Sequence, residues 1–475
     1  MVPTAIPIIT THFKSIDGVG WYASAYFLGA TAVHGISWKL YSIASVKLIY
    51  ILNLVAYIAG SAVCGTSSSS SALMIGRAVS GAAAVCLSPG VLRMVAVSTP
   101  FKKRPVYSGL FGAMYGLASI VGPILGGSLT YKVSWRWIFY IKIPSGLVVL
   151  TIIIFLFNTS KGARDSIANM GWRWRMARLD IEGSVFITAS LSCLILALNW
   201  GGTTMAWSDP RIIGLTCVFG ILFVLFAAKQ FWRKEDASLP PRLMKQRSSL
   251  GALWFSFTLG SSLQIVNYYL PFWFQTVKGV SALQSGIMNF PLVISLVVSS
   301  ILSGVMVSAI GYYTPFMVGS SILTAVGTGM LSTLSPQSSH VAWILYQVLC
   351  GIGLGLGAHQ PIMVAQNILE IRDAAAGVSM MILAQNLSAA IFASVSQNVF
   401  KGRLVSNLEQ YTPSLDPATV LSFGAANLQD SIEPQYLGGV RLAYNNALSK
   451  SYLVAAVVAA TSMVGSVVIE WKSIR

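Results

Sequence analysis

Several side chains that could take part in proton or ligand chemistry lie within long apolar segments. Arg77 is the charged residue of the segment 73–81. A charge inside a membrane-spanning helix is costly and is therefore a functional hypothesis, although an arginine near a helix end can also extend its head group to the membrane surface. His34 and His359 could exchange a proton near neutral pH, although a buried, hydrogen-bonded histidine has a structural role more often. These three residues are our candidates for coupling.

Amide side chains in other apolar segments could line a cavity for a ligand. The alternative is that each amide bonds to a neighbouring helix, which is the usual role of a lone amide in a membrane. The candidates for a substrate cavity are Gln264, Asn267, Gln360, Gln385 and Asn386.

One apolar segment combines small residues with a proline. Ala118, Gly122 and Gly126 are spaced four residues apart and therefore share one helix face. Small residues at this spacing let a neighbouring helix approach closely within a membrane. Pro123 removes a backbone donor and bends the helix, and Gly127 follows directly after Gly126. The pattern predicts a bent, closely packed helix that is suited to a moving joint.

Other classes of site lack support in the sequence. There is no phosphate-binding loop of the Gly-x-x-x-x-Gly-Lys-Ser/Thr type and no cluster of metal ligands. The glycine-rich stretch 351–357 superficially resembles a dinucleotide-binding loop, but it lies inside an apolar segment with no strand before it, so helix packing is the better interpretation. We therefore expect no metal, no cofactor and no enzymatic activity.

The composition indicates a membrane protein. Of 475 residues, 55% are hydrophobic and only 9% are charged, whereas soluble domains carry about 25% charged residues. The net charge of +17 does not indicate nucleic-acid binding, because the basic residues lie in short segments between apolar runs. That arrangement is typical of a polytopic membrane protein with basic cytosolic loops. The runs are long enough to cross a bilayer as helices, so we predict an all-α integral membrane fold.

The apolar runs also predict how the chain is organised. With an incomplete first run at 1–11, they predict about 14 spans, and the placement of basic residues orients them with the N-terminus in the cytosol. The complete runs are 20–37, 48–64, 73–97, 106–130, 137–157, 181–200, 212–228, 250–274, 287–309, 316–334, 341–368, 374–400 and 452–469. We expect an N-terminal half at 1–157, basic cytosolic loops with two extra central spans at 158–247, and a C-terminal half at 248–475 that includes an extracellular loop at 401–450.

An aromatic cluster opens the run at 137–157. Trp135, Arg136 and Trp137 stand at its start, and Lys142 follows. Tryptophans beside an arginine are typical of the belt that anchors a helix at the membrane surface. We therefore expect these side chains to lie at the outer interface.

Taken together, these motifs resemble those of one transporter family. The segment from Gly122 to Gly127 resembles the antiporter motif of the major facilitator superfamily, with Ala118 where glycine is commonest. The spacing around Arg77 resembles the arginine-glycine motif of the same superfamily. Residues 135–146 look like an element of the fourteen-span drug:proton antiporters, with Lys142 where asparagine is usual. The similarity is closest to fungal multidrug and toxin efflux carriers.

The resemblance implies a fold and a function. It implies two six-helix halves plus two extra central helices, which rock around a central site and open it alternately to each side. A hydrophobic drug, toxin or secondary metabolite would leave in exchange for protons, with the proton gradient as the energy source. Arg77 would serve proton coupling or conformational switching. The implied partners are the lipid bilayer, the substrate and protons, with no nucleic acid and no obligate protein partner, most simply at the plasma membrane, although a vacuolar or vesicular membrane stays open.

Two departures from the family pattern keep alternatives open. The inner half of the first span, where relatives carry an acidic residue, is absent, and Trp38 occupies a position that is normally glycine. The chain could therefore be a transport-dead receptor or scaffold. Uptake of an iron chelate or another solute by the same fold is a further alternative.

Overall fold

The computed structural model describes most of the chain as helix. It describes residues 45–100, 133–157, 181–201, 205–233, 241–369, 371–417 and 432–473, together with Val420 and scattered positions before residue 45 and between 106 and 129. Within these residues the only extended pairing is an isolated bridge between Gly201 and Met205. The all-α fold predicted from composition is therefore confirmed.

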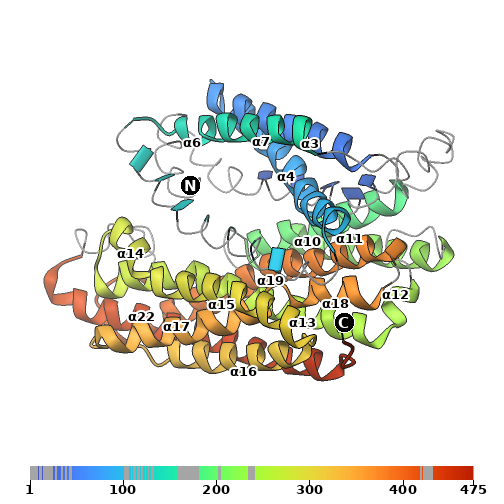
Figure 1. The fold of residues 1–475 in the computed structure, drawn as a ribbon. Coiled ribbons are helices and arrows are strands. Elements are labelled where there is room, and N and C mark those ends of the chain that lie inside the picture. Colours follow the sequence, from blue (N-terminus) through green and yellow to red (C-terminus); the bar gives the residue numbers. More distant parts are fainter. Residues whose placement is uncertain are drawn as a thin grey trace.

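The helices form two groups (Figure 1). One group contains α3, α4, α6 and α7, and the other contains α13 to α19 with α22; α10 packs against both α11 and α19. The bounds of the first group and the central helices are α3 Val46–Thr66, α4 Ser70–Ser98, α6 Trp137–Tyr140, α7 Lys142–Leu156, α10 Ile181–Trp200, α11 Pro210–Arg233 and α12 Pro241–Lys245. Those of the second group are α13 Arg247–Trp273, η3 Phe274–Lys278, α14 Ala282–Met288, α15 Phe290–Ile310, α16 Thr314–Leu331, α17 His340–Gly357, α18 Gln360–Ile368, α19 Ile371–Tyr411 and α22 Pro434–Val468.

Nine helices among the described residues are long and apolar enough to cross a membrane. Three of the other predicted spans, at 1–11, 20–37 and 106–130, fall largely outside the described residues. The remaining two correspond to α10, whose apolar stretch is shorter, and to α19. A multi-pass membrane protein is thus confirmed, while the number of about 14 spans stays a prediction.

The predicted extracellular loop at 401–450 is largely helical. α19 continues to Tyr411, and α22 already begins at Pro434. These extensions bury apolar side chains in the core of the second group, which explains why they remain helical; the fully buried ones include Leu404, Leu408, Val440, Ala443 and Leu448. Whether this segment lies outside the cell stays a prediction.

The predicted run 341–368 is divided into two helices. α17 ends at Gly357 and α18 begins at Gln360. Pro361 stands in the first turn of α18, where its missing N–H costs nothing, whereas the same proline inside a continuous helix would break a hydrogen bond. The interruption sets His359 and Gln360 between the two helices.

Close helix packing accounts for the glycines of the stretch 351–357, as predicted from the sequence. A Cβ on Gly351 or Gly355 would collide with backbone carbonyls of α15, and a Cβ on Gly353 would collide with backbone atoms of α16. Alternating faces of α17 therefore touch two different helices at close range.

Serine hydroxyls join the helices of the second group. Ser320 Oγ donates to the Gly353 carbonyl at 2.6 Å, and Ser462 Oγ donates to Ser321 Oγ at 2.7 Å. Ser262 Oγ reaches the Ala455 carbonyl on α22 at 2.9 Å. Because the hydrocarbon supplies no alternative partners, such bonds fix one helix against another.

The aromatic cluster at 135–137 is only partly at the interface. Trp137 is 48% exposed, as an interface residue should be, but Trp135 is only 4% exposed and packs with Ile138 and Phe139. Arg136 donates to the carbonyl of Ser67 just beyond the end of α3, at 3.1 Å. The belt prediction is therefore wrong for Trp135, whose ring is needed to fill the space between helices.

Candidate functional site

Arg77 lies in the interior of the first helix group. Its residue is 8% exposed, and its guanidinium carbon lies 5.4 Å from the centre of the Tyr26 ring. Tyr57 and Cys64 of α3 are also electrostatic neighbours of Arg77. The arginine Nε is buried and has no hydrogen-bond partner in the part of the chain that the structure describes.

A second basic residue lies close to Arg77. Lys142 is the first residue of α7, and its electrostatic neighbours are Arg77 and Cys64. Its Nζ atom lies 5.4 Å from the centre of the Phe139 ring and 5.8 Å from that of Tyr57. The structure therefore brings two positive side chains together among aromatic rings.

Polar candidates of the second helix group meet around the break between α17 and α18. Gln360 Nε2 donates to the Leu356 carbonyl at 3.1 Å and to Ser303 Oγ at 3.4 Å. Gln385 Nε2 donates to the Ala358 carbonyl at 3.4 Å. His359 lies in the same break. Gln360, Gln385 and His359 are thus neighbours, although the sequence places them in two different runs.

The remaining candidates lie apart or outside the described residues. Gln264 and Asn267 are half-buried on α13, and Asn386 is exposed on α19. Of the predicted joint, Gly122 and Gly126 are buried while Ala118 is exposed. Pro123, Gly127 and His34 lie outside the described residues. The roles of all these residues stay predictions.

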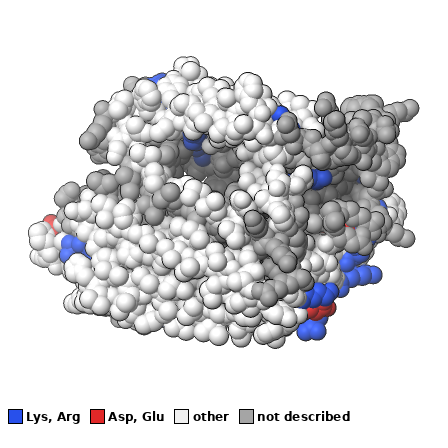
Figure 2. Space-filling model, in the orientation of Figure 1, with Lys and Arg blue, Asp and Glu red and all other residues white. Residues whose placement is uncertain are grey.

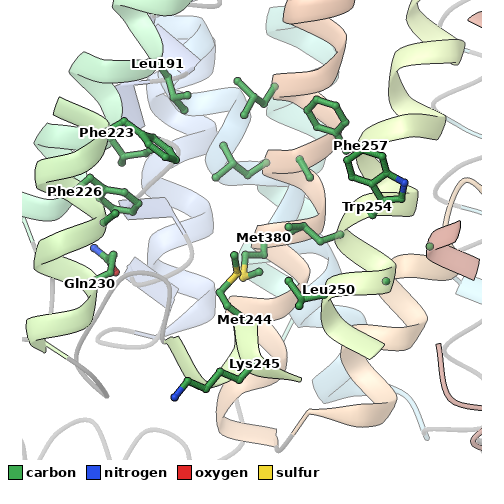
Figure 3. A pocket seen from close by; sticks show the side chains of 18 of the residues that line it. Leu191, Phe223, Phe226, Gln230, Met244, Lys245, Leu250, Trp254, Phe257 and Met380 are labelled. Atoms are coloured by element: carbon green, nitrogen blue, oxygen red, sulfur yellow. The ribbon is translucent and has the colours of Figure 1, made fainter. Parts of the chain in front are cut away.

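A large apolar cavity that was not predicted from the sequence lies between helices of the central pair and the second group (Figure 3). Its volume is about 790 Å³, and it lies between the pair α10–α11 and the helices α12, α13, α19 and α22. Among the described residues, almost all of its wall is aliphatic, aromatic or methionine, and only Gln230 and Lys245 add polar groups. Labelled lining residues include Leu191, Phe223, Phe226, Leu250, Trp254, Phe257, Met244 and Met380. A pocket of this size and polarity suits a drug-sized hydrophobic ligand.

The cavity is open toward the side of the helix bundle. Phe223, Phe231 and Trp254 line it and are 45%, 65% and 45% exposed. In a membrane protein, exposed apolar side chains within the membrane-spanning part face the lipid. Methionines such as Met244 and Met380 adapt to ligands of different shape because their side chains are flexible.

Two ion pairs join helices that surround the cavity. Glu182 of α10 pairs with Lys229 of α11, and Arg242 of α12 pairs with Asp373 of α19. The Glu182 side chain is 66% exposed, so this pair contributes at most about 1 kcal/mol. Lys245, at the rim of the cavity, extends away from it (Figure 3).

A hollow lies between the two helix groups, which meet elsewhere where α4 contacts α19. Figure 2 shows the hollow between the layer of α3, α4, α6 and α7 and the larger layer, with lysine or arginine side chains in its wall. Two helical bodies with a space between them are the arrangement that alternating access requires.

Comparison with known proteins identifies the family of this chain. The model of the Major Facilitator Superfamily matches residues 1–393. The chain belongs to the major facilitator superfamily. It is therefore an integral, multi-pass membrane protein of a transporter family, as the motifs around Arg77 and Gly122 predicted.

Two similar superfamily members come from fungi. The chain is 44% identical over 475 residues to "MFS-type efflux pump MFS1" of Arthroderma benhamiae, covering all of this chain and 88% of that protein. It is 41% identical over 475 residues to "Efflux pump roqT" of Penicillium rubens, with the same coverage. Among solved structures, the human organic anion transporter MFSD10 matches with a TM-score of 0.57 at 14% identity, over 96% of this chain and 88% of that chain. The last match supports the shared fold alone.

Proposed function

We propose that this superfamily member exports hydrophobic small molecules in exchange for protons, by alternating access between its two helix groups. The observation that carries the proposal is the apolar cavity. It accepts a hydrophobic molecule of drug size and opens sideways, so that a compound dissolved in the bilayer reaches it without crossing water. The basic residues around it, Lys229, Arg242 and Lys245, predict that it lies toward the cytosol.

The relatives favour export over the two alternatives. Two similar proteins bear the words efflux pump in their names, and they cover the whole of this chain. A proton gradient is the proposed energy source because the sequence has no phosphate-binding loop for ATP.

Transport in vesicles tests the proposal. Inside-out vesicles with an acidic lumen should accumulate a hydrophobic fluorescent dye such as 1-pyrenebutyric acid, and a protonophore should abolish the accumulation. Accumulation that persists with the protonophore would contradict proton coupling. Transport in the opposite direction would favour an uptake carrier, and no transport of any probe would favour a receptor or scaffold.

Filling the cavity should reduce export. Ala384 lines it and is 7% exposed, so Ala384→Phe places a ring in the space that the ligand would occupy. We expect the initial rate of dye accumulation to fall about tenfold, which corresponds to about 1.4 kcal/mol. The matched control is Val224→Phe on α11, where the side chain is 65% exposed and does not line the cavity. Equal rates for the two variants would show that the cavity is not on the transport route.

A further inference from the structure

The first helix group carries positive charge without any acidic residue. The sequences of α3, α4, α6 and α7 contain no aspartate and no glutamate. Lys47 of α3 donates to the carbonyl of Ile154, and Arg136, directly before α6, donates to that of Ser67. Such bonds satisfy a positive head group without a counter-ion.

Arg77 and Lys142 differ from these two residues. In the part of the chain that the structure describes, their charged groups lie against aromatic ring faces rather than against carbonyls or carboxylates. Contact with a ring contributes about 0.5–2 kcal/mol, whereas transfer of a charge out of water costs several kcal/mol per ion. The two like charges also repel each other. Among the described residues, the pair therefore lacks an anion that would offset these costs.

The chemistry of Arg77 also limits its role. An arginine keeps its proton under all physiological conditions, so Arg77 cannot itself carry the proton that drives transport. Its planar guanidinium is instead suited to a carboxylate, which it binds through two parallel hydrogen bonds. Lys142 adds a second positive charge beside Arg77.

We infer that Arg77 and Lys142 bind the acidic group of the transported compound, so that the substrates are amphipathic organic anions. The acid is a carboxylate or an acidic enol, held beside the rings of Tyr26, Tyr57 and Phe139. Figure 2 shows lysine or arginine side chains in the wall of the hollow between the two helix groups. This inference rests on the proposed export function and specifies its substrate class.

Binding to the purified full chain tests the inference without transport. The protein is placed in nanodiscs of phosphatidylcholine alone, and 1-pyrenebutyric acid is compared with its methyl ester by energy transfer from tryptophan, with empty nanodiscs subtracted. The wild type should bind the acid about tenfold more tightly than the ester, or about 1.4 kcal/mol. Lys142→Asn should reduce the ratio to below about twofold, while Lys142→Arg should preserve it. Unchanged binding of the ester by Lys142→Asn shows that the variant is folded.

A matched variant and a transport measurement separate the outcomes. Lys47→Gln removes a positive charge of the first helix group whose head group already donates to the Ile154 carbonyl, and it should leave the preference for the acid intact. No preference in the wild type, or a preference that survives Lys142→Asn, would overturn the inference. If vesicles export the ester but not the acid, the inference about the substrate class is wrong while the export function is supported. If the acid binds through Lys142 and neither probe is exported, the anion site is supported while the export function is contradicted.

Discussion

Gly351→Leu should leave almost no folded transporter in the membrane. A Cβ at residue 351 would collide with the Leu292 carbonyl and with Ser295 Oγ on α15, before the rest of the leucine is added. Ser299 Oγ donates to the Gly351 carbonyl at 3.4 Å, so a hydrogen bond also joins α15 and α17 where they approach closely. Neither helix can withdraw, because the opposite face of α17 is equally close to α16 through Gly353. We expect a loss of stability of about 3 kcal/mol or more.

The measurement is the fraction of protein that elutes as a single species after detergent extraction, normalised to total expression. Gly319→Leu on α16 is the matched control, because nothing lies within 4 Å of a Cβ at that position. It should resemble the wild type. If Gly351→Leu also yields a single, thermally stable species, the close packing of α17 on α15 is not needed for folding.

Gly122→Leu should abolish export while the protein still reaches the membrane. Gly122 and Gly126 are both buried and lie one helical turn apart, so a leucine between them and a neighbouring helix would hold that joint in one position. A transporter that cannot change conformation retains binding but not turnover. We expect less than a tenth of the wild-type rate of dye accumulation, which corresponds to a barrier raised by more than about 1.4 kcal/mol.

The same segment provides the control. Ala118 belongs to the same spacing but is exposed, so Ala118→Leu should preserve export. Surface labelling of both variants in intact cells shows whether they reach the membrane. Normal export by Gly122→Leu, or equal loss in the two variants, would contradict a joint at the buried glycines.

The positions of the spans could be predicted because lipid imposes a simple rule on sequence. The run 48–64 became Val46–Thr66, and the run 181–200 became Ile181–Trp200. α19 and α22 extend well beyond their apolar runs, since Leu404, Leu408 and Val440 are buried by each other and not by lipid. Hydropathy detects contact with lipid, and it does not detect this kind of contact between helices.

The candidate site could likewise be predicted only in part from the sequence. Arg77 and Lys142 could each be recognised as unusual, but their proximity depends on how α4 and α7 each pack against α3, which no local pattern records. The apolar cavity left no signal at all, because Leu250 or Phe223 in its wall reads like any lipid-facing residue. Trp135 and Trp137 show the limit most plainly, since two tryptophans two residues apart are buried and exposed respectively.

The sideways opening of the apolar cavity also determines what an apparent affinity would mean for this carrier. A compound that enters from the bilayer is present there at a concentration set by its partition coefficient, and each additional methylene group raises that concentration about fourfold, or about 0.8 kcal/mol. Half-saturation values expressed per litre of water would then fall along a homologous series even if every member fitted the protein equally well. The membrane would act as a first stage of selection, and the protein would discriminate only among the compounds that the lipid has already concentrated.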